Sequence, residues 1–211
     1  MRIYLETDQF TGGQMKKIIL LMTILLLAGC SSNKPEEPAK LTEGAKYFPL
    51  AEGDTWYFTT SDQRKIVRTV SGDTTVLSIT CKRVLENDST AEAWTVDTSG
   101  FKLHLLLKDN WADPPLLIPF NLVQGKPYHY DSRVYFYEGG NLFYSQFTGS
   151  LEFKGYVSKT VAAGTFAGAI KLHYIPDGST AYDEYYGRGV GLLDNGDYFL
   201  DSAYIGGVWY K

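Results

Sequence analysis

The sequence contains few of the residue types that usually form metal and redox sites. Its 211 residues include two cysteines, Cys30 and Cys81, and three histidines, His104, His129 and His173. The histidines are far apart in the sequence and fall at polar-facing positions of alternating segments, so a metal site would require the fold to gather them. We therefore predict no metal site and no cofactor.

Motifs that identify common enzymes are also missing. The chain has no Gly-x-Ser-x-Gly elbow, no His-Glu-x-x-His motif and no Cys-x-x-Cys pair. The glycines within 187–191 precede a predicted hairpin instead of a helix, which argues against a phosphate-binding loop. The acidic turn at 194–197 lacks the later bidentate glutamate of a calcium loop. These absences predict a protein that is not an enzyme, with no catalytic residues and with binding residues still to be identified.

An excess of positive charge is absent as well. The chain has 20 basic and 24 acidic residues, which gives a formal net charge of −4. A mildly acidic protein is not expected to bind nucleic acid or to adsorb to anionic lipid by charge alone.

One apolar run, at 18–28, predicts where the protein works. Lys16 and Lys17 precede it, and Leu27-Ala28-Gly29-Cys30 ends it. A membrane-spanning helix needs about 20 apolar residues, so this shorter run fits a signal peptide instead. Residues 1–14 place two acids ahead of the lysines, which suits no export signal, so we expect translation to begin at Met15.

The Leu-Ala-Gly-Cys ending resembles the lipobox of bacterial lipoproteins. The resemblance implies that residues 1–29 are removed as a lipoprotein signal peptide. It also implies that the thiol of Cys30 receives a diacylglyceryl group and that the freed amine is acylated, as with palmitate. Several buried acyl chains hold a protein stably on a membrane. Ser31, at the next position, implies sorting to the bacterial outer membrane, on its periplasmic or its surface side.

Residues 30–46 are predicted to form a flexible tether, and residues 47–211 a single β domain. The tether contains prolines and charges but almost no apolar side chains, so it cannot bury enough surface to offset the cost of ordering. In the domain, apolar and polar residues alternate with a period of two. A clear example is the run Leu77, Ile79, Cys81 and Leu85. The alternation places Cys81 in the core, and no long segment has helical spacing.

Turn signals separate the predicted strands. They occur at 71–73, 86–88, 138–141, 176–178 and 194–197. Asn195-Gly196 is the strongest hairpin signal, because a type I′ turn needs positive φ at both central residues. Strands joined by such short turns run antiparallel. About ten to twelve of them in one domain imply a large curved sheet, a barrel or a sandwich.

Two segments repeat one pattern. Residues 50–58 and 122–130 share a leucine, a glycine and two aromatic positions at the same spacing. The repeat predicts a turn at the glycine followed by a strand whose alternate aromatic rings cover the sheet. On this interpretation Trp56 belongs to the core.

Three motifs together resemble a widespread group of uncharacterised bacterial lipoproteins. They are Phe48-Pro49-Leu50 with Gly53 and Trp56, Val161-Ala162-Ala163-Gly164-Thr165-Phe166, and Tyr185-Tyr186 with Gly189-Val190-Gly191. The resemblance implies a single antiparallel sheet strongly curved into a half-barrel, similar to the lipoprotein-carrier (LolA-like) fold. The group has no established catalytic residues, so the resemblance assigns none.

Two neighbouring acids, Asp183 and Glu184, lie beside Tyr182, Tyr185 and Tyr186. Carboxylates beside aromatic rings can bind or cleave sugars. Neighbouring strand residues point to opposite faces, however, so the two acids are poorly placed to act as a pair. We interpret the segment as a tyrosine-rich sheet surface.

Three functions remain open. The first is a lipid-anchored cell-envelope protein without enzymatic activity, whose curved sheet binds an apolar or amphipathic ligand, such as a lipid, or a partner protein. The second is a structural or assembly lipoprotein that recognises another envelope component through a strand edge. The third is a hydrolase of envelope glycans. A continuous apolar groove favours the first, a filled interior the second, and two carboxylates converging in a cleft the third.

The lipobox interpretation predicts that Cys30→Ala remains an unlipidated precursor, because the thiol that would be modified is lost. Metabolic labelling with palmitate should mark the wild-type protein and leave this variant unmarked. Cys81→Ala is the matched control and should keep its label. Label on Cys30→Ala would contradict the interpretation.

Overall fold

A computed structural model of the chain describes residues 37–106 and 110–211. The predicted signal peptide, Cys30 and Ser31 lie outside these residues. Within the described part, no helix is both long and apolar enough to cross a membrane. The packed unit is Pro38–Lys211.

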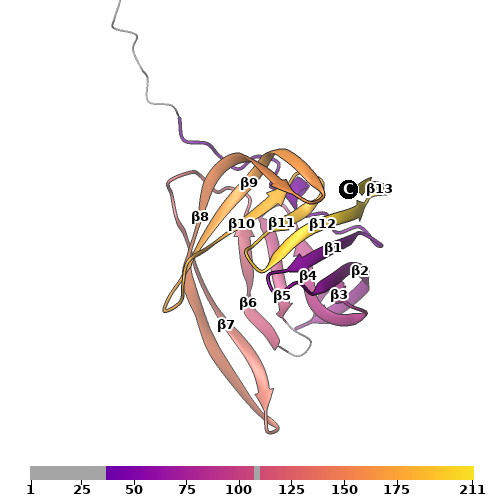
Figure 1. Cartoon of the computed structure of the whole chain (residues 1–211). Helices are drawn as coiled ribbons and strands as arrows, with labels where there is room; N and C mark the ends of the chain where they lie inside the picture. The colour runs from indigo at the N-terminus through magenta and orange to yellow at the C-terminus, as the bar shows by residue number, and fades with distance from the viewer. Residues whose placement is uncertain (1–36, 107–109) are drawn as a thin grey trace, which may run out of the picture. The chain divides into compact units, whose positions relative to one another are not determined.

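This unit is built almost entirely from strands (Figure 1). Its described residues form the 3₁₀ helix η1 (Gly44–Tyr47) and the strands β1 (Thr55–Thr60), β2 (Lys65–Val76), β3 (Ile79–Glu86), β4 (Ser89–Val96), β5 (Gly100–Leu106), β6 (Asn110–Pro119), β7 (Tyr128–Glu138), β8 (Asn141–Val161), β9 (Gly164–Pro176), β10 (Tyr182–Gly187), β11 (Gly191–Asp194), β12 (Tyr198–Ile205) and β13 (Val208–Tyr210).

The strands form an antiparallel barrel. Each strand pairs with the next in sequence, and β1 also pairs with β12, from Thr55 opposite Tyr204 to Thr60 opposite Tyr198. β13 folds back on the end of β12 as a short hairpin. The predicted all-β fold with a strongly curved antiparallel sheet is confirmed. The half-barrel is corrected to a twelve-stranded barrel, because the first and twelfth strands satisfy each other's free edges.

The packed unit begins earlier than the sequence predicts. Leu41 is 4% exposed, and its N–H donates a hydrogen bond to the carbonyl oxygen of Leu122 at 2.8 Å. Lys40 pairs with Val123 in an isolated β-bridge. Residues 38–46, which were assigned to the tether, therefore belong to the domain. The buried Leu41 and hydrogen bonds to Leu122, Gln124 and Tyr156 hold this otherwise polar segment against the barrel.

The region around Cys81 confirms one prediction and corrects two. Cys81 is buried in a small cluster with Val76 and Ala93. Leu77 and Ile79, expected on the same apolar face, are instead exposed where β2 turns into β3. The predicted turn at 71–73 is wrong, because β2 continues through it as a β-bulge opposite β3.

The other predicted turns occur where expected, between β3 and β4, β7 and β8, β9 and β10, and β11 and β12. At Asn195-Gly196, however, only the glycine has positive φ, so the type I′ geometry is wrong. The Asn195 side chain accepts hydrogen bonds from the N–H groups of Asp197 (3.1 Å) and Tyr198 (2.8 Å) and forms the turn in this way.

The repeated pattern is confirmed as two strand starts. Gly53 and Gly125 both have positive φ, and β1 and β7 begin two and three residues later. The first of these strands carries Trp56, which is 3% exposed and donates from Nε1 to the carbonyl oxygen of Val190 at 2.5 Å. A Cβ on Gly191 would lie 3.2 Å from this nitrogen. A glycine is therefore needed where β11 begins against the indole.

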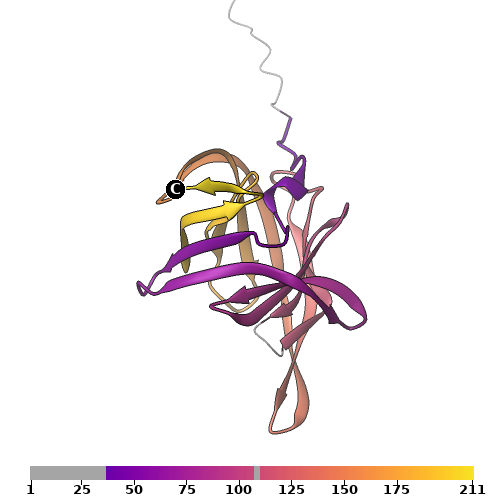
Figure 2. The same ribbon diagram turned by 90° about the vertical axis from the view of Figure 1, so that its right-hand side faces the viewer.

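A long hairpin, β7–β8, extends beyond the barrel in both views (Figures 1 and 2). Tyr137, Leu142, Phe143 and Tyr144 near its tip are all about half exposed or more. The buried clusters lie elsewhere, and every member of them falls within Pro38–Lys211. This unit therefore has its own hydrophobic core and is expected to fold without the residues that precede it.

Replacing Trp56 with alanine should lower the free energy of unfolding by about 3–5 kcal/mol, because a buried indole is lost and a cavity remains. Chemical denaturation of the Pro38–Lys211 unit measures this. Trp209→Ala, at a tryptophan that is 49% exposed, should cost much less. A Trp56→Ala protein as stable as wild type would show that Trp56 is not part of the core.

Candidate ligand-binding cavity

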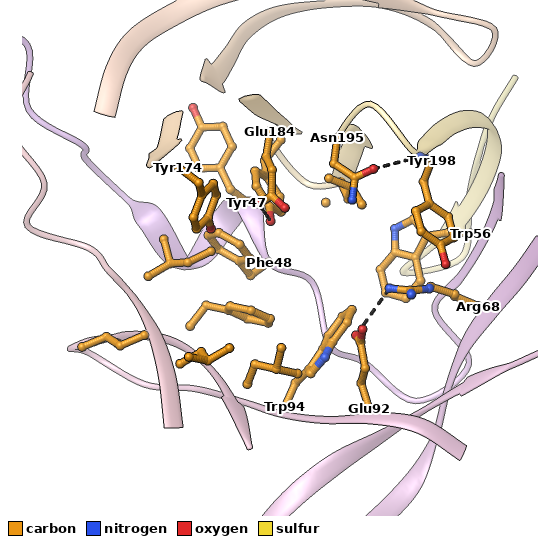
Figure 3. A pocket seen from close by; sticks show the side chains of 18 of the residues that line it. Tyr47, Phe48, Trp56, Arg68, Glu92, Trp94, Tyr174, Glu184, Asn195 and Tyr198 are labelled. Atoms are coloured by element: carbon orange, nitrogen blue, oxygen red, sulfur yellow. Dashed lines mark hydrogen bonds and ion pairs between the residues drawn. The ribbon is translucent and has the colours of Figure 1, made fainter. Parts of the chain in front are cut away.

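The barrel encloses a cavity of about 290 Å³ (Figure 3). Twelve of the 22 residues that line it are aromatic, and five of the other ten are leucine or isoleucine. The lining residues come from strands all around the barrel and from the segment that includes η1. The volume is close to the lower limit for small-molecule sites, which are mostly apolar with a few placed polar groups.

Aromatic rings form a continuous part of the wall. Phe48, directly after η1, stacks on Phe101 with 4.7 Å between ring centroids. Trp94 meets the ring of Phe101 edge-on at 5.2 Å, and Trp56 lies 6.2 Å from Trp94. Such contacts hold large flat side chains in fixed positions. The wall is therefore preformed.

A charged group lies on one side of the cavity. The guanidinium of Arg68 on β2 binds Glu86 at 2.9 Å and Glu92 at 3.4 Å, and these acids come from β3 and β4. Its Cζ lies 4.7 Å from the ring centroid of Tyr198. The Arg68 side chain is 12% exposed and that of Glu92 is 18% exposed. One cation is thus shared by two carboxylates in a mostly apolar interior.

Burial and neighbouring charges shift the pKa values of Glu92 and Arg68. Burial raises the pKa of Glu92, and the attraction of Arg68 only partly opposes the shift. Burial alone would lower the pKa of Arg68, but Glu92 and Glu86 outweigh it, so its pKa is raised. The guanidinium is therefore always charged.

A second acid, Glu184, faces the same cavity from β10. The hydroxyl of Tyr186 donates a hydrogen bond to its Oε2 at 2.6 Å. In Figure 3, Glu184 and Tyr174 lie apart from the group around Arg68. Burial raises the pKa of Glu184, and burial also raises the pKa of Tyr174 and Tyr186 well above that of a free phenol. No ion pair to Glu184 exists among the described residues.

The neighbouring acid faces the other way. Asp183 binds Lys171 and His173, each at 2.7 Å, on the outer face of the sheet. Opposite orientation of Asp183 and Glu184 is therefore confirmed. The interpretation of a tyrosine-rich surface is wrong for Tyr186, which is 9% exposed and lines the cavity, whereas Tyr182 lines the cavity but stays 38% exposed. Because the sheet closes into a barrel, side chains that an open sheet would expose form the wall of the cavity.

The histidines do not come together. His104 is 3% exposed and its Nε2 lies 2.8 Å from the Thr95 hydroxyl, which corrects its predicted polar-facing position. Burial, helped by Lys102, lowers the pKa of His104. His129 is exposed and His173 pairs with Asp183. Among the described residues, no group of three or more His, Cys, Asp or Glu side chains could hold a metal ion.

The sequence analysis did not identify Arg68 or Glu92. A signal was present, because Arg68 alternates with Ile66 and Val70, which are both buried. A charged residue between two apolar residues of the same strand face indicates a buried charge. Its partners could not be found in this way, because they lie on other strands.

Two buried polar atoms of the cavity wall lack a hydrogen-bond partner within the described protein. They are Nε1 of Trp94 and the hydroxyl of Tyr130. Tyr130 is only 8% exposed. An unpaired buried polar group costs about 1–3 kcal/mol. A ligand with a polar group would remove this cost.

Comparisons with known proteins identify no family. No protein-family model matches the chain, and no curated protein is similar to it. A crystal structure of a "putative lipoprotein" from Parabacteroides distasonis is 14% identical, covers 74% of this chain and 97% of its own, and gives a TM-score of 0.41. We base neither the fold nor the function on a similarity this weak.

Arg68→Met should lower the free energy of unfolding by about 3–5 kcal/mol at pH 7.5, because two buried carboxylates lose their partner. The loss should be smaller at pH 5. An acid with a raised pKa binds more protons in the folded state, so stability falls as pH rises through that pKa. Denaturation at both pH values measures this.

Arg64→Met is the matched control, because the Arg64–Asp62 pair is exposed. This variant should leave the unfolding midpoint unchanged at either pH. An equal loss for Arg68→Met at pH 5 and 7.5 would show that no buried carboxylate is left uncompensated.

Proposed function

We propose that this protein is a lipid-anchored cell-envelope protein that binds a small amphipathic molecule inside its barrel and catalyses no reaction. The observation that supports this best is the aromatic cavity of about 290 Å³, since a structural protein without a small ligand is expected to have a filled interior. The preformed wall lowers the entropic cost of binding.

The cavity fits an amphipathic ligand better than a purely apolar one. Its wall combines aromatic and leucine side chains with Arg68, Glu92, Glu184 and the unpaired atoms of Trp94 and Tyr130. Polar groups of this kind orient a ligand whose body is held by apolar contact.

A seam between β6 and β7 offers an entrance. The two strands pair only between Trp111 and Asp113 on β6 and the facing residues of β7, because the prolines that follow, Pro114 and Pro115, cannot donate to a ladder. A surface depression lies at this seam, and Leu116, Leu117 and Tyr130 line both it and the interior cavity. These three side chains lie between the depression and the interior cavity.

The anchor is the lipidated Cys30 that the lipobox implies. The resemblance also supports an outer-membrane location, through Ser31. The membrane is thus one partner of the protein, and the cavity ligand is the other.

A glycan hydrolase is the second candidate, because Glu92 and Glu184 line one cavity. A glycosidase needs one protonated and one ionised carboxyl group that are free to reach the substrate. Here burial raises the pKa of both acids, Arg68 binds Glu92, and Tyr186 binds Glu184. Both groups are therefore better suited to hold a ligand than to cleave one.

The Pro38–Lys211 unit should bind the neutral apolar dye N-phenyl-1-naphthylamine saturably, with a rise in dye fluorescence. Leu103→Trp, which adds bulk to the cavity wall, should weaken binding at least roughly tenfold, because overpacked interiors resist added volume. Leu142→Trp, at an exposed hairpin position, is the control and should bind as wild type does. Absence of saturable binding, or binding unchanged in Leu103→Trp, would refute the cavity as a ligand site.

A further inference from the structure

The charges inside the barrel indicate which amphipathic molecules it binds. Among the described residues, three acids face or adjoin the cavity, namely Glu86, Glu92 and Glu184, against the single cation Arg68. We propose that the cavity selects an apolar molecule that carries one ammonium group, and that this group binds beside Glu184. The inference rests on the proposed binding function and names its ligand class.

The free carboxyl group is Glu184. Arg68 is already occupied by Glu86 and Glu92, and no ion pair to Glu184 exists within the described part of the chain. A buried carboxylate without a cation is costly. An ammonium group on a ligand would supply the missing charge, and the Tyr186 hydroxyl holds Glu184 in position at 2.6 Å to receive it.

The aromatic wall favours the same charge. The faces of aromatic rings carry negative electrostatic potential and attract ammonium groups. Tyr174 and Tyr182 stack 5.0 Å apart beside Glu184, and Phe48 lies 4.8 Å from Tyr186. These rings and the carboxyl group belong to the wall of one cavity, so an ammonium group beside Glu184 lies near aromatic rings.

An anionic head group does not fit this interior. The only guanidinium is held by two carboxylates, so a fatty-acid carboxylate would have to displace one of them. It would also meet Glu184 without compensation. The same hydrocarbon chain should therefore bind more tightly with an ammonium head than with a carboxylate head.

Protonation gives a second signature. The titratable and charged groups that act on Glu184 are Tyr174, Tyr182, Tyr186, Glu92 and Arg68. The phenols have raised pKa values and Arg68 stays charged, so the groups whose pKa values burial moves toward neutral pH are the two acids. A bound ammonium group favours the ionised acid, so its affinity should rise from pH 5 to pH 8.

The test compares three probes with one eight-carbon chain: n-octylammonium, n-octanoate and 1-octanol. Each is titrated against the Pro38–Lys211 unit by its displacement of N-phenyl-1-naphthylamine, and by the change in tryptophan fluorescence, to which Trp56 and Trp94 in the cavity wall contribute. Octylammonium should bind at least roughly tenfold more tightly than the other two, a ratio within the range of a desolvated cation–π contact. Its affinity should also be higher at pH 8 than at pH 5.

Glu184→Gln should reduce octylammonium binding to the level of 1-octanol and leave 1-octanol unchanged. Asp183→Asn, at the neighbouring outward-facing acid, is the matched control and should bind octylammonium as wild type does. The three-probe comparison on the wild-type unit does not depend on either variant.

Each other outcome has a definite meaning. Octanoate binding as tightly as octylammonium, or Asp183→Asn losing as much affinity as Glu184→Gln, overturns the cation selectivity and leaves the cavity as a binding site. If none of the three probes and no dye binds, the proposed function fails together with this inference.

Discussion

Closure of the sheet by pairing of β1 with β12 is the constraint on which the rest of the structure depends. A single sheet with two free edges would expose both of its faces. Pairing of Thr55–Thr60 with Tyr198–Tyr204 satisfies both edges and separates an inner face from an outer one. A polar side chain that points inward must then find a hydrogen-bond or ion-pair partner inside the barrel. If it finds none, its burial costs free energy, and a bound ligand can remove this cost.

The interior charges show this consequence directly. Arg68, Glu86 and Glu92 come from three adjacent strands and satisfy one another, whereas Glu184 receives a phenol hydrogen bond and no counter-ion. A fully apolar interior of the same volume would be as stable or more so. On the proposed function, these polar groups select a ligand, at a cost in stability.

Local features of the fold could be predicted from the sequence. Alternation identified strands, glycines with positive φ marked where β1 and β7 begin, and burial of Trp56 and Cys81 followed from their positions. Prediction of the candidate site was much poorer. The alternation at 182–186 predicts a surface position for Glu184. The sequence does not predict the pairing of Arg68 with Glu92, because this pairing joins strands whose register the sequence does not reveal.

The sequence by itself determined the strand content and most turns, because each of these depends on residues that are neighbours in the chain. Only the tertiary structure decided that the sheet closes, that Leu41 belongs to the packed unit, and that Tyr182, Glu184 and Tyr186 face inward. The physical reason is that a period of two fixes which residues share a face of a strand. It does not determine which face is enclosed. Contacts between strands as distant in sequence as β1 and β12 determine which face lies inside the barrel.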